Sequence, residues 1–376
     1  MKVVVVSGIW PPDVGGPASH APEVADFLYE RGHDVEVVTT ALRPPERRAY
    51  PVTAVARSLP PGVRHLRGAA VVRERARRAD VVYTTGMFGR SFAGATAAGR
   101  PYVLKLTADP AFERARRRGI VVGDVDEFQG ARRDLRVAAL RLARDVELRR
   151  AAHVFCPSEY LRTLTITWGV PAARVSVLPN PAPRLPELAS REELRRDFGM
   201  NGMTLAFAGR LTAQKSLGLA LEAVAAVDGV SLFIAGDGER EPVELRAREL
   251  ALGDRVRFLG ALPRDRVLAL FRAADASILS SSWENFPHSV VEALAAGTPV
   301  ISTAVGGVAE VVHDGENGLL VPSGDGDALA AAVRRYVSDE ALRERLRAAA
   351  AGSVRSYDRE SVFGRIEQAL ADAAAA

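Results

Sequence analysis

Short runs of β-branched and other apolar residues alternate with longer amphipathic stretches along the whole chain. In the first half these runs lie at residues 3–7, 35–40, 81–84, 102–106, 153–156 and 175–178. In the second half they lie at residues 204–208, 231–235, 256–259, 276–279, 300–303 and 318–321. Runs without clean polar–apolar alternation are typical of parallel strands covered on both faces. The pattern therefore predicts an α/β protein with two doubly wound domains.

A proline-rich segment separates the two halves. Residues 178–186 contain four prolines, and such a stretch continues neither a sheet nor a helix. We expect an N-terminal domain over residues 1–182 and a C-terminal domain over residues 183–354. The helical segment at about 355–376 either caps the second domain or packs back on the first. Two paired α/β domains bind ligands in the cleft between them, at the carboxyl ends of the strands. The loops that follow the strands should therefore carry the functional residues.

Composition and charge exclude several classes of protein. The 376 residues are 48% hydrophobic and 26% charged, without an apolar run long enough to cross a bilayer or to form a signal peptide. The single cysteine, Cys156, excludes an intrachain disulfide and a cysteine-based zinc cluster. The net charge of +4 is too small to indicate nucleic acid as a partner. We therefore expect a cytoplasmic protein.

Lysine is rare in this chain. Only three of the 50 basic residues are lysines, which together with abundant alanine indicates a GC-rich bacterial genome. Lys105 and Lys215 are therefore unexpected on composition. Lys215 comes five residues after Arg210, in the loop that Gly209 opens after a predicted strand. A guanidinium and a mobile ammonium on one loop suit a diphosphate, although two solvated surface bases would give the same pattern.

Glycines also mark the first loop of the chain. Gly15 and Gly16 precede a predicted helix that opens with Pro17. Their backbone N–H groups suit a phosphate or a sugar hydroxyl, and equally an ordinary turn. The loop does not match G-x-G-x-x-G, which argues against a dinucleotide oxidoreductase.

Two carboxylates flank a predicted helix start in the second domain. Glu284 lies in the loop before Pro287, which suits the first helical turn, and Glu292 lies inside the helix. Such a pair can hold vicinal hydroxyls, whereas alone Glu292 suits a surface salt bridge and Glu284 a helix-start acid. Leu262, in a mostly apolar loop, suits either a flat base or a buried turn.

Together these loops resemble the donor site of retaining glycosyltransferases of family 4, which have the GT-B fold of two Rossmann-like domains. The motifs that carry the resemblance are Gly209-Arg210-x4-Lys215, Glu284-x7-Glu292 and Gly306-Gly307-x-x-Glu310. The resemblance covers nearly the whole chain. It implies transfer of a sugar from a nucleotide-diphosphate sugar to an acceptor hydroxyl with retained anomeric configuration, without a metal or other cofactor.

The resemblance also implies roles for single residues. It implies catalytic roles for Arg210 and Lys215, which neutralise the leaving diphosphate, and for Glu284, which contacts the donor sugar. The implied donor-binding residues are Gly15, Gly16, Gly209, Leu262, Asn285, Phe286, Pro287, His288 and Glu292. Many relatives carry a histidine after the strand at 102–106, where this chain has Asp109, so Asp109 takes that catalytic role or the role is absent. Asn180-Pro181 replaces the family's usual Asn-Gly.

The acceptor and other partners are less defined. The resemblance places an acceptor (a glycan, a lipid-linked molecule or a small molecule) on the first domain and leaves the oligomeric state open. Arginines crowd residues 114–150, which suits peripheral contact with the inner face of a membrane or with a phosphorylated acceptor. Few large apolar residues lie between these arginines, and Asp134, Asp145 and Glu147 are interspersed among them, which favours a solvated helix instead. Two rival functions are a nucleotide-sugar 2-epimerase of the same architecture and a non-catalytic nucleotide-sugar-binding protein.

Overall fold

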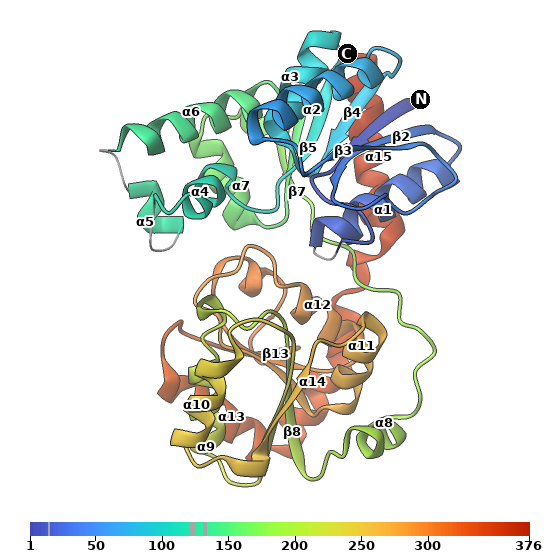
Figure 1. The fold of residues 1–376 in the computed structure, drawn as a ribbon. Coiled ribbons are helices and arrows are strands. Elements are labelled where there is room, and N and C mark those ends of the chain that lie inside the picture. Colours follow the sequence, from blue (N-terminus) through green and yellow to red (C-terminus); the bar gives the residue numbers. More distant parts are fainter. Residues whose placement is uncertain (14–15, 121–124, 131–133) are drawn as a thin grey trace. The chain divides into compact units, whose positions relative to one another are not determined.

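The structure is a computed structural model that describes residues 1–13, 16–120, 125–130 and 134–376 (Figure 1). The chain divides into two compact units. The first comprises Met1–Asn180 together with Arg359–Ala376, and the second comprises Pro181–Asp358. Each unit is built around one parallel sheet with helices between successive strands, as the sequence pattern predicts.

The first unit contains a seven-stranded sheet of order β3-β2-β1-β4-β5-β6-β7. Its strands are β1 (Lys2–Val6), β2 (Asp34–Ala41), β3 (Val52–Ala56), β4 (Val81–Thr84), β5 (Tyr102–Lys105), β6 (His153–Cys156) and β7 (Val175–Val177). Its helices are α1 (Gly16–Glu30), α2 (Pro61–Ala76), α3 (Phe88–Ala98), α4 (Pro110–Arg117), α5 (Val125–Gly130), α6 (Leu135–Arg149), α7 (Glu159–Thr167) and α15 (Arg359–Ala375).

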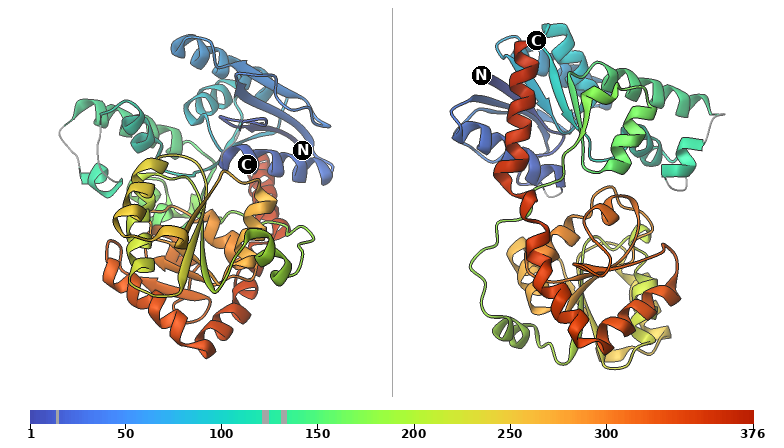
Figure 2. Two further views of the ribbon diagram at one scale, coloured as in Figure 1. Left: turned by 60° about the horizontal axis from the view of Figure 1, so that its bottom comes forward. Right: turned by 180° about the vertical axis from the view of Figure 1, so that it is seen from behind.

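Both faces of this first sheet are buried. Val3 and Val5 of β1 belong to one apolar cluster, which includes Phe363 of α15. Val4 and Val6 belong to a second cluster on the opposite face of the strand. Figure 2 shows α15 running along the first unit, so the end of the chain completes the core of the unit in which the chain begins.

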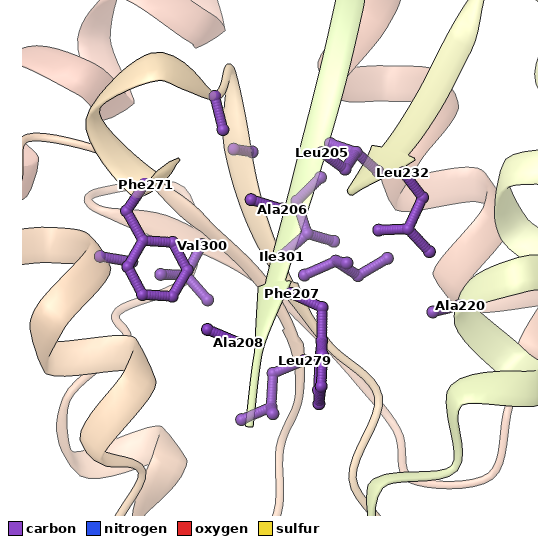
Figure 3. Close-up of a cluster of buried hydrophobic side chains, with 14 of the residues drawn as sticks. Leu205, Ala206, Phe207, Ala208, Ala220, Leu232, Phe271, Leu279, Val300 and Ile301 are labelled. Carbon is purple, nitrogen blue, oxygen red and sulfur yellow. The ribbon is translucent and has the colours of Figure 1, made fainter. Parts of the chain in front are cut away.

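The second unit contains a six-stranded parallel sheet of order β10-β9-β8-β11-β12-β13. Its strands are β8 (Met203–Ala208), β9 (Val230–Ala235), β10 (Val256–Gly260), β11 (Ala276–Leu279), β12 (Val300–Thr303) and β13 (Gly318–Val321). Its α-helices are α8 (Arg191–Phe198), α9 (Leu217–Ala225), α10 (Arg240–Glu249), α11 (Arg264–Ala273), α12 (His288–Ala295), α13 (Gly326–Ser338) and α14 (Glu340–Ser353). Leu205, Phe207 and Leu232 lie in its buried core (Figure 3).

The strand order reverses between β8 and β11. From β8 the chain adds β9 and β10 on one side, and it then returns to place β11, β12 and β13 on the other. Loops at such a switch point diverge and leave room for a ligand at the carboxyl ends of the strands. The loops after β8 and β11 are those that carry the predicted site.

The strand predictions are confirmed, with one omission. All twelve predicted runs form strands, but β3 was not predicted. β3 is an edge strand with only one fully buried residue, Val55, so it lacks the apolar run that marks the others. A second difference concerns Pro287, which precedes α12 as its N-cap instead of occupying the first turn.

Candidate functional site

The loop after β8, which carries Arg210, packs tightly against the loop after β9. Leu211 makes two backbone hydrogen bonds to that neighbouring loop. At Gly236, φ is +143° and a Cβ would lie 1.8 Å from the carbonyl oxygen of Gly209. At Gly238, φ is +133° and a Cβ would lie 2.3 Å from the carbonyl oxygen of Leu211. Only glycines allow this approach, and the pair thereby fixes the backbone around Arg210.

Lys215 and Glu284 form an ion pair at the centre of the predicted site. The side chains are 17% and 8% exposed, and Ser281 Oγ donates to the same carboxylate oxygen at 2.7 Å. Ser280 Oγ bonds to the backbone oxygens of Lys215 and Ser216 at 2.9 and 3.0 Å. The loops after β8 and β11 are therefore held together by polar contacts that sequence reasoning did not predict.

The loop after β12 supports Glu284 from its other side. At Gly306, φ is +48°, and a Cβ there would lie 1.8 Å from the carbonyl oxygen of Glu284. The N–H of Gly307 donates to that oxygen at 3.2 Å. Thr303 Oγ1 donates to the carbonyl oxygen of Ser281 at 2.6 Å. The glycine pair noted in the sequence thus gives Glu284 a fixed backbone position.

The two predicted cations differ in their surroundings. Arg210 is exposed, whereas Lys215 is held against Glu284 between two loops. An exposed guanidinium can rearrange around an incoming anion, and a held ammonium is already in place for one. Both lie in one short loop at the switch point of the sheet, so the structure keeps them on the same edge.

Glu292 lies on α12, beside the loop after β10. Its carboxylate is 3.5 Å from Nε of Arg264, and its side chain is 20% exposed. Burial raises the pKa of Glu292, and the nearby Arg264 opposes this shift. The salt bridge that would explain Glu292 without a ligand is therefore present. Leu262 is partly buried and packs against the core of the unit.

The residues before α12 form a compact turn. Phe286 is 9% exposed, and the ring of the exposed His288 meets its ring edge-on, with the two centroids 5.7 Å apart. The backbone oxygen of Pro287 accepts from two N–H groups of the helix, those of Val290 and Val291. Asn285 is half-buried in the same turn.

In the first unit, Gly15 lies outside the described residues, and Gly16 begins α1. Arg57 anchors the segment before that helix. One of its terminal nitrogens donates to Gly8 O at 3.2 Å and pairs with Asp13 at 2.6 Å. Nε of Arg57 donates to Thr40 Oγ1 at 3.1 Å. One arginine thus ties the loop after β1 to the neighbouring strand.

Asp109 has a structural role that sequence reasoning missed. Its carboxylate caps α4 by accepting from Ala111 N at 2.8 Å and also accepts from Gln129 at 2.9 Å. Arg144 pairs with it at 2.8 Å and stacks on Trp168, 3.8 Å from the ring centroid. The Asp109 side chain is 0% exposed. These contacts account for the residue without a substrate, and its catalytic role stays a prediction.

Lys105 lies in the core of the first unit. It is fully buried at the end of β5, where Nζ donates to the carbonyl oxygen of Pro179 at 3.2 Å. Burial lowers its pKa to about 7. The unexpected lysine of the first domain therefore contacts the backbone of the segment that leaves the unit.

No three histidine, cysteine, aspartate or glutamate side chains within residues 1–13, 16–120, 125–130 and 134–376 gather closely enough to hold a metal ion. In the described part of the chain, none of the helices combines the length and apolar character needed to cross a bilayer.

Comparisons with known proteins match this architecture. Residues 15–181 match the model "Glycosyl transferase 4-like domain", and residues 190–352 match "Glycosyl transferases group 1". A D-inositol 3-phosphate glycosyltransferase of Acidothermus cellulolyticus is 31% identical, over 96% of this chain and 87% of that protein. A phosphatidyl-myo-inositol mannosyltransferase of Mycobacterium leprae is 38% identical over 44% of this chain, and a lipopolysaccharide core biosynthesis glycosyltransferase of Rhizobium meliloti is 40% identical over 37%. These last two alignments span only 45% and 40% of those proteins.

Solved structures agree on the fold. Anabaena HepE, in complex with UDP and glucose, superposes with a TM-score of 0.78 at 21% identity, covering 99% of this chain and 100% of that one. Sucrose-phosphate synthase from Thermosynechococcus elongatus gives 0.79 at 20% identity, covering 98% and 97%. The two units therefore form a GT-B fold, as expected. With the family matches across both units, the chain belongs to the group 1, family 4-like glycosyltransferases.

Proposed function

We propose that this glycosyltransferase moves a sugar from a nucleotide-diphosphate sugar to an acceptor hydroxyl, with retention of configuration. The second unit binds the donor, and the first binds the acceptor. The observation that carries the proposal is the cluster of Lys215, Glu284 and Ser281 beside the loop of Arg210. A complex of HepE with UDP-glucose is a further support, since that protein shares the fold.

Charge compensation is the chemical task of this cluster. When the glycosidic bond breaks, negative charge grows on the leaving diphosphate, and fixed cations stabilise that transition state. Lys215 is held by Glu284 before the donor arrives, so its ammonium needs little reorganisation. The diphosphate then shares the ammonium with the carboxylate, while the exposed Arg210 closes on it as a fork.

Glu284 contributes in two ways under this proposal. It orients Lys215 through the ion pair, and its carboxylate can accept hydrogen bonds from donor-sugar hydroxyls. Its backbone is fixed by Gly306 and Gly307. Glu292 accepts hydrogen bonds from the ribose hydroxyls, for which it exchanges part of its contact with Arg264.

A panel of nucleotide sugars, followed by mass spectrometry, tests the proposal. We expect one donor to bind and to be slowly hydrolysed to the free sugar and the nucleoside diphosphate, with faster turnover when an acceptor is added. Conversion of a donor alone into its 2-epimer would instead identify an epimerase. Binding without turnover under any acceptor condition would identify a nucleotide-sugar-binding protein.

A further inference from the structure

Helix α6 of the first unit has two different faces. Val137, Leu140 and Leu148 are buried against the unit. Leu135, Leu142 and Val146 are instead 86%, 65% and 41% exposed. Large apolar side chains that stay this exposed contribute little hydrophobic stabilisation to the fold.

The three exposed side chains lie on one stripe. Positions 135, 142 and 146 are separated by seven and four residues, which places them on one side of a helix. Exposed alanines fill the same stripe at Ala138, Ala139 and Ala143. We call this stripe, residues 135, 138, 139, 142, 143 and 146, the α6 face. Exposed apolar side chains gathered on one face, unlike ones scattered singly, are typical of a contact surface.

Exposed arginines stand at both ends of the α6 face, and two acids, Asp134 and Asp145, lie beside it. Arg136 stands near its beginning and Arg149 and Arg150 at its end, and all three are exposed. Helix α4 lies beside α6, tied to it by the 2.9 Å ion pair of Arg114 with Glu147. That contact is on the buried side of α6, so the exposed Arg116, Arg117 and Arg118 at the end of α4 form a separate basic group. Figure 1 shows α6 as a long helix with α4 and α5 beside it.

The prediction of a solvated helix rested on the small number of large apolar residues between the arginines. That number does not show how many of them face outward in the folded helix. Arg144 points inward and pairs with Asp109. Leu135, Leu142 and Val146 are instead exposed on the outer side of the helix. The outward face is therefore more apolar than the segment as a whole.

We propose that the α6 face docks flat on an anionic lipid surface. Apolar side chains of the stripe enter the boundary between headgroups and acyl chains, while the arginines at its two ends contact lipid phosphates. An apolar stripe with three arginines at its ends and two acids beside it carries a net positive charge, so it fits this occupant by charge as well as by polarity. This docking does not depend on the proposed function. The further idea that the lipid surface carries a lipid-linked acceptor does rest on the proposed function.

Co-sedimentation of the full chain with vesicles tests the docking. We expect binding to vesicles that mix phosphatidylcholine with phosphatidylglycerol, and much weaker binding to phosphatidylcholine alone. Raising the salt from about 0.01 M to about 0.15 M shortens the Debye length from about 30 Å to about 8 Å, so binding should fall. The double variant Leu142→Gln/Val146→Gln should bind about tenfold less, because it loses two apolar contacts.

Matched variants keep the test specific. Glutamine is a good helix former, so melting temperatures should stay near that of the wild type. Leu245→Gln on α10 and Leu66→Gln on α2 remove leucines that are 50% and 77% exposed elsewhere, and both should bind like the wild type. Arg136→Gln/Arg150→Gln should weaken binding mainly at low salt.

Three results would overturn the proposal: no sedimentation of the wild type with anionic vesicles at low salt, a Leu142→Gln/Val146→Gln variant that sediments like the wild type, or equal loss in the Leu245→Gln control. A dimer that this double variant abolishes would assign the face to a second copy of the chain instead. Since sedimentation needs neither donor nor turnover, these results are independent of whether sugar transfer is observed.

Discussion

Replacement of Lys215 by alanine separates the diphosphate role of this residue from its structural one. The variant removes an ammonium that is 17% exposed and leaves Glu284, at 8% exposure, with Ser281 as a remaining donor. Breaking a fully buried pair costs about 3–5 kcal/mol of stability, and the partial exposure here reduces this to about 2 kcal/mol. Loss of a preorganised cation at the leaving group should cost about 3 kcal/mol of transition-state stabilisation, or at least about a hundredfold in kcat.

A second substitution distinguishes the two effects. In Lys215→Ala/Glu284→Gln the unpaired carboxylate is gone, so the melting temperature should recover relative to Lys215→Ala alone. Sugar transfer should not recover, because the cation is still missing and the proposed contact of Glu284 with the donor sugar is removed as well. Lys2→Ala is the matched control, since Lys2 is a surface lysine whose side chain is 61% exposed in its pair with Asp34.

Steady-state kinetics with the identified donor, beside thermal melts of each variant, decide the question. A Lys215→Ala variant with kcat near that of the wild type would refute the diphosphate assignment. So would a double variant that regains activity together with stability, because Lys215 would then act only by neutralising Glu284.

Arg210→Ala should also lower kcat by about a hundredfold. The effects of Arg210→Ala and Lys215→Ala on kcat should be less than additive, because both residues act on one diphosphate. The control is Arg240→Ala, which replaces an exposed arginine of α10. Glu292→Gln should chiefly raise the KM for the donor, because ribose contacts persist through the reaction, and an unchanged KM would exclude that contact. Turnover should survive EDTA, because Arg210 and Lys215 supply the positive charge; a loss that a divalent ion restores would count against this site. Burial lowers the pKa of Lys105 to about 7, whereas the unfolded chain keeps it at about 10.4, so wild-type stability should rise with pH across that window. The stability of Lys105→Met relative to the wild type should therefore be greatest below about pH 7 and should decline toward pH 10.4, and a pH-independent difference in urea unfolding would contradict it.

The sequence predicted the sheets because strands buried on both faces are apolar runs, such as 204–208 and 300–303. It predicted the loops of the site because chemistry collects at the carboxyl ends of parallel strands. What it could not predict depends on contacts between distant residues. Lys215 and Glu284 are 69 residues apart, and the Asp109–Arg144 pair is 35 apart.

The role of the Gly306-Gly307 motif could likewise be predicted only in part. The Gly306-Gly307 motif was recognised in the sequence, but its close approach to Glu284 appears only when β11 and β12 lie side by side. The hydroxyl groups that join the loops, Ser280 and Ser281, stood in a visible serine run after a predicted strand. That run was a signal for the missed contacts, since small hydroxyl side chains at a strand end are suited to bridging loops.

In the proposed site, the second unit holds a diphosphate between Lys215 and Arg210. Calorimetric titration of the full chain with the nucleoside diphosphate of its donor, and with the matching nucleoside monophosphate, tests it most directly. We expect the wild type to bind the diphosphate at least about tenfold more tightly than the monophosphate. The variant Lys215→Ala/Arg210→Ala should lose this preference, and Lys2→Ala should keep it. Equal affinity of the wild type for the two nucleotides, or an undiminished preference in the double variant, would show that Lys215 and Arg210 do not hold a diphosphate.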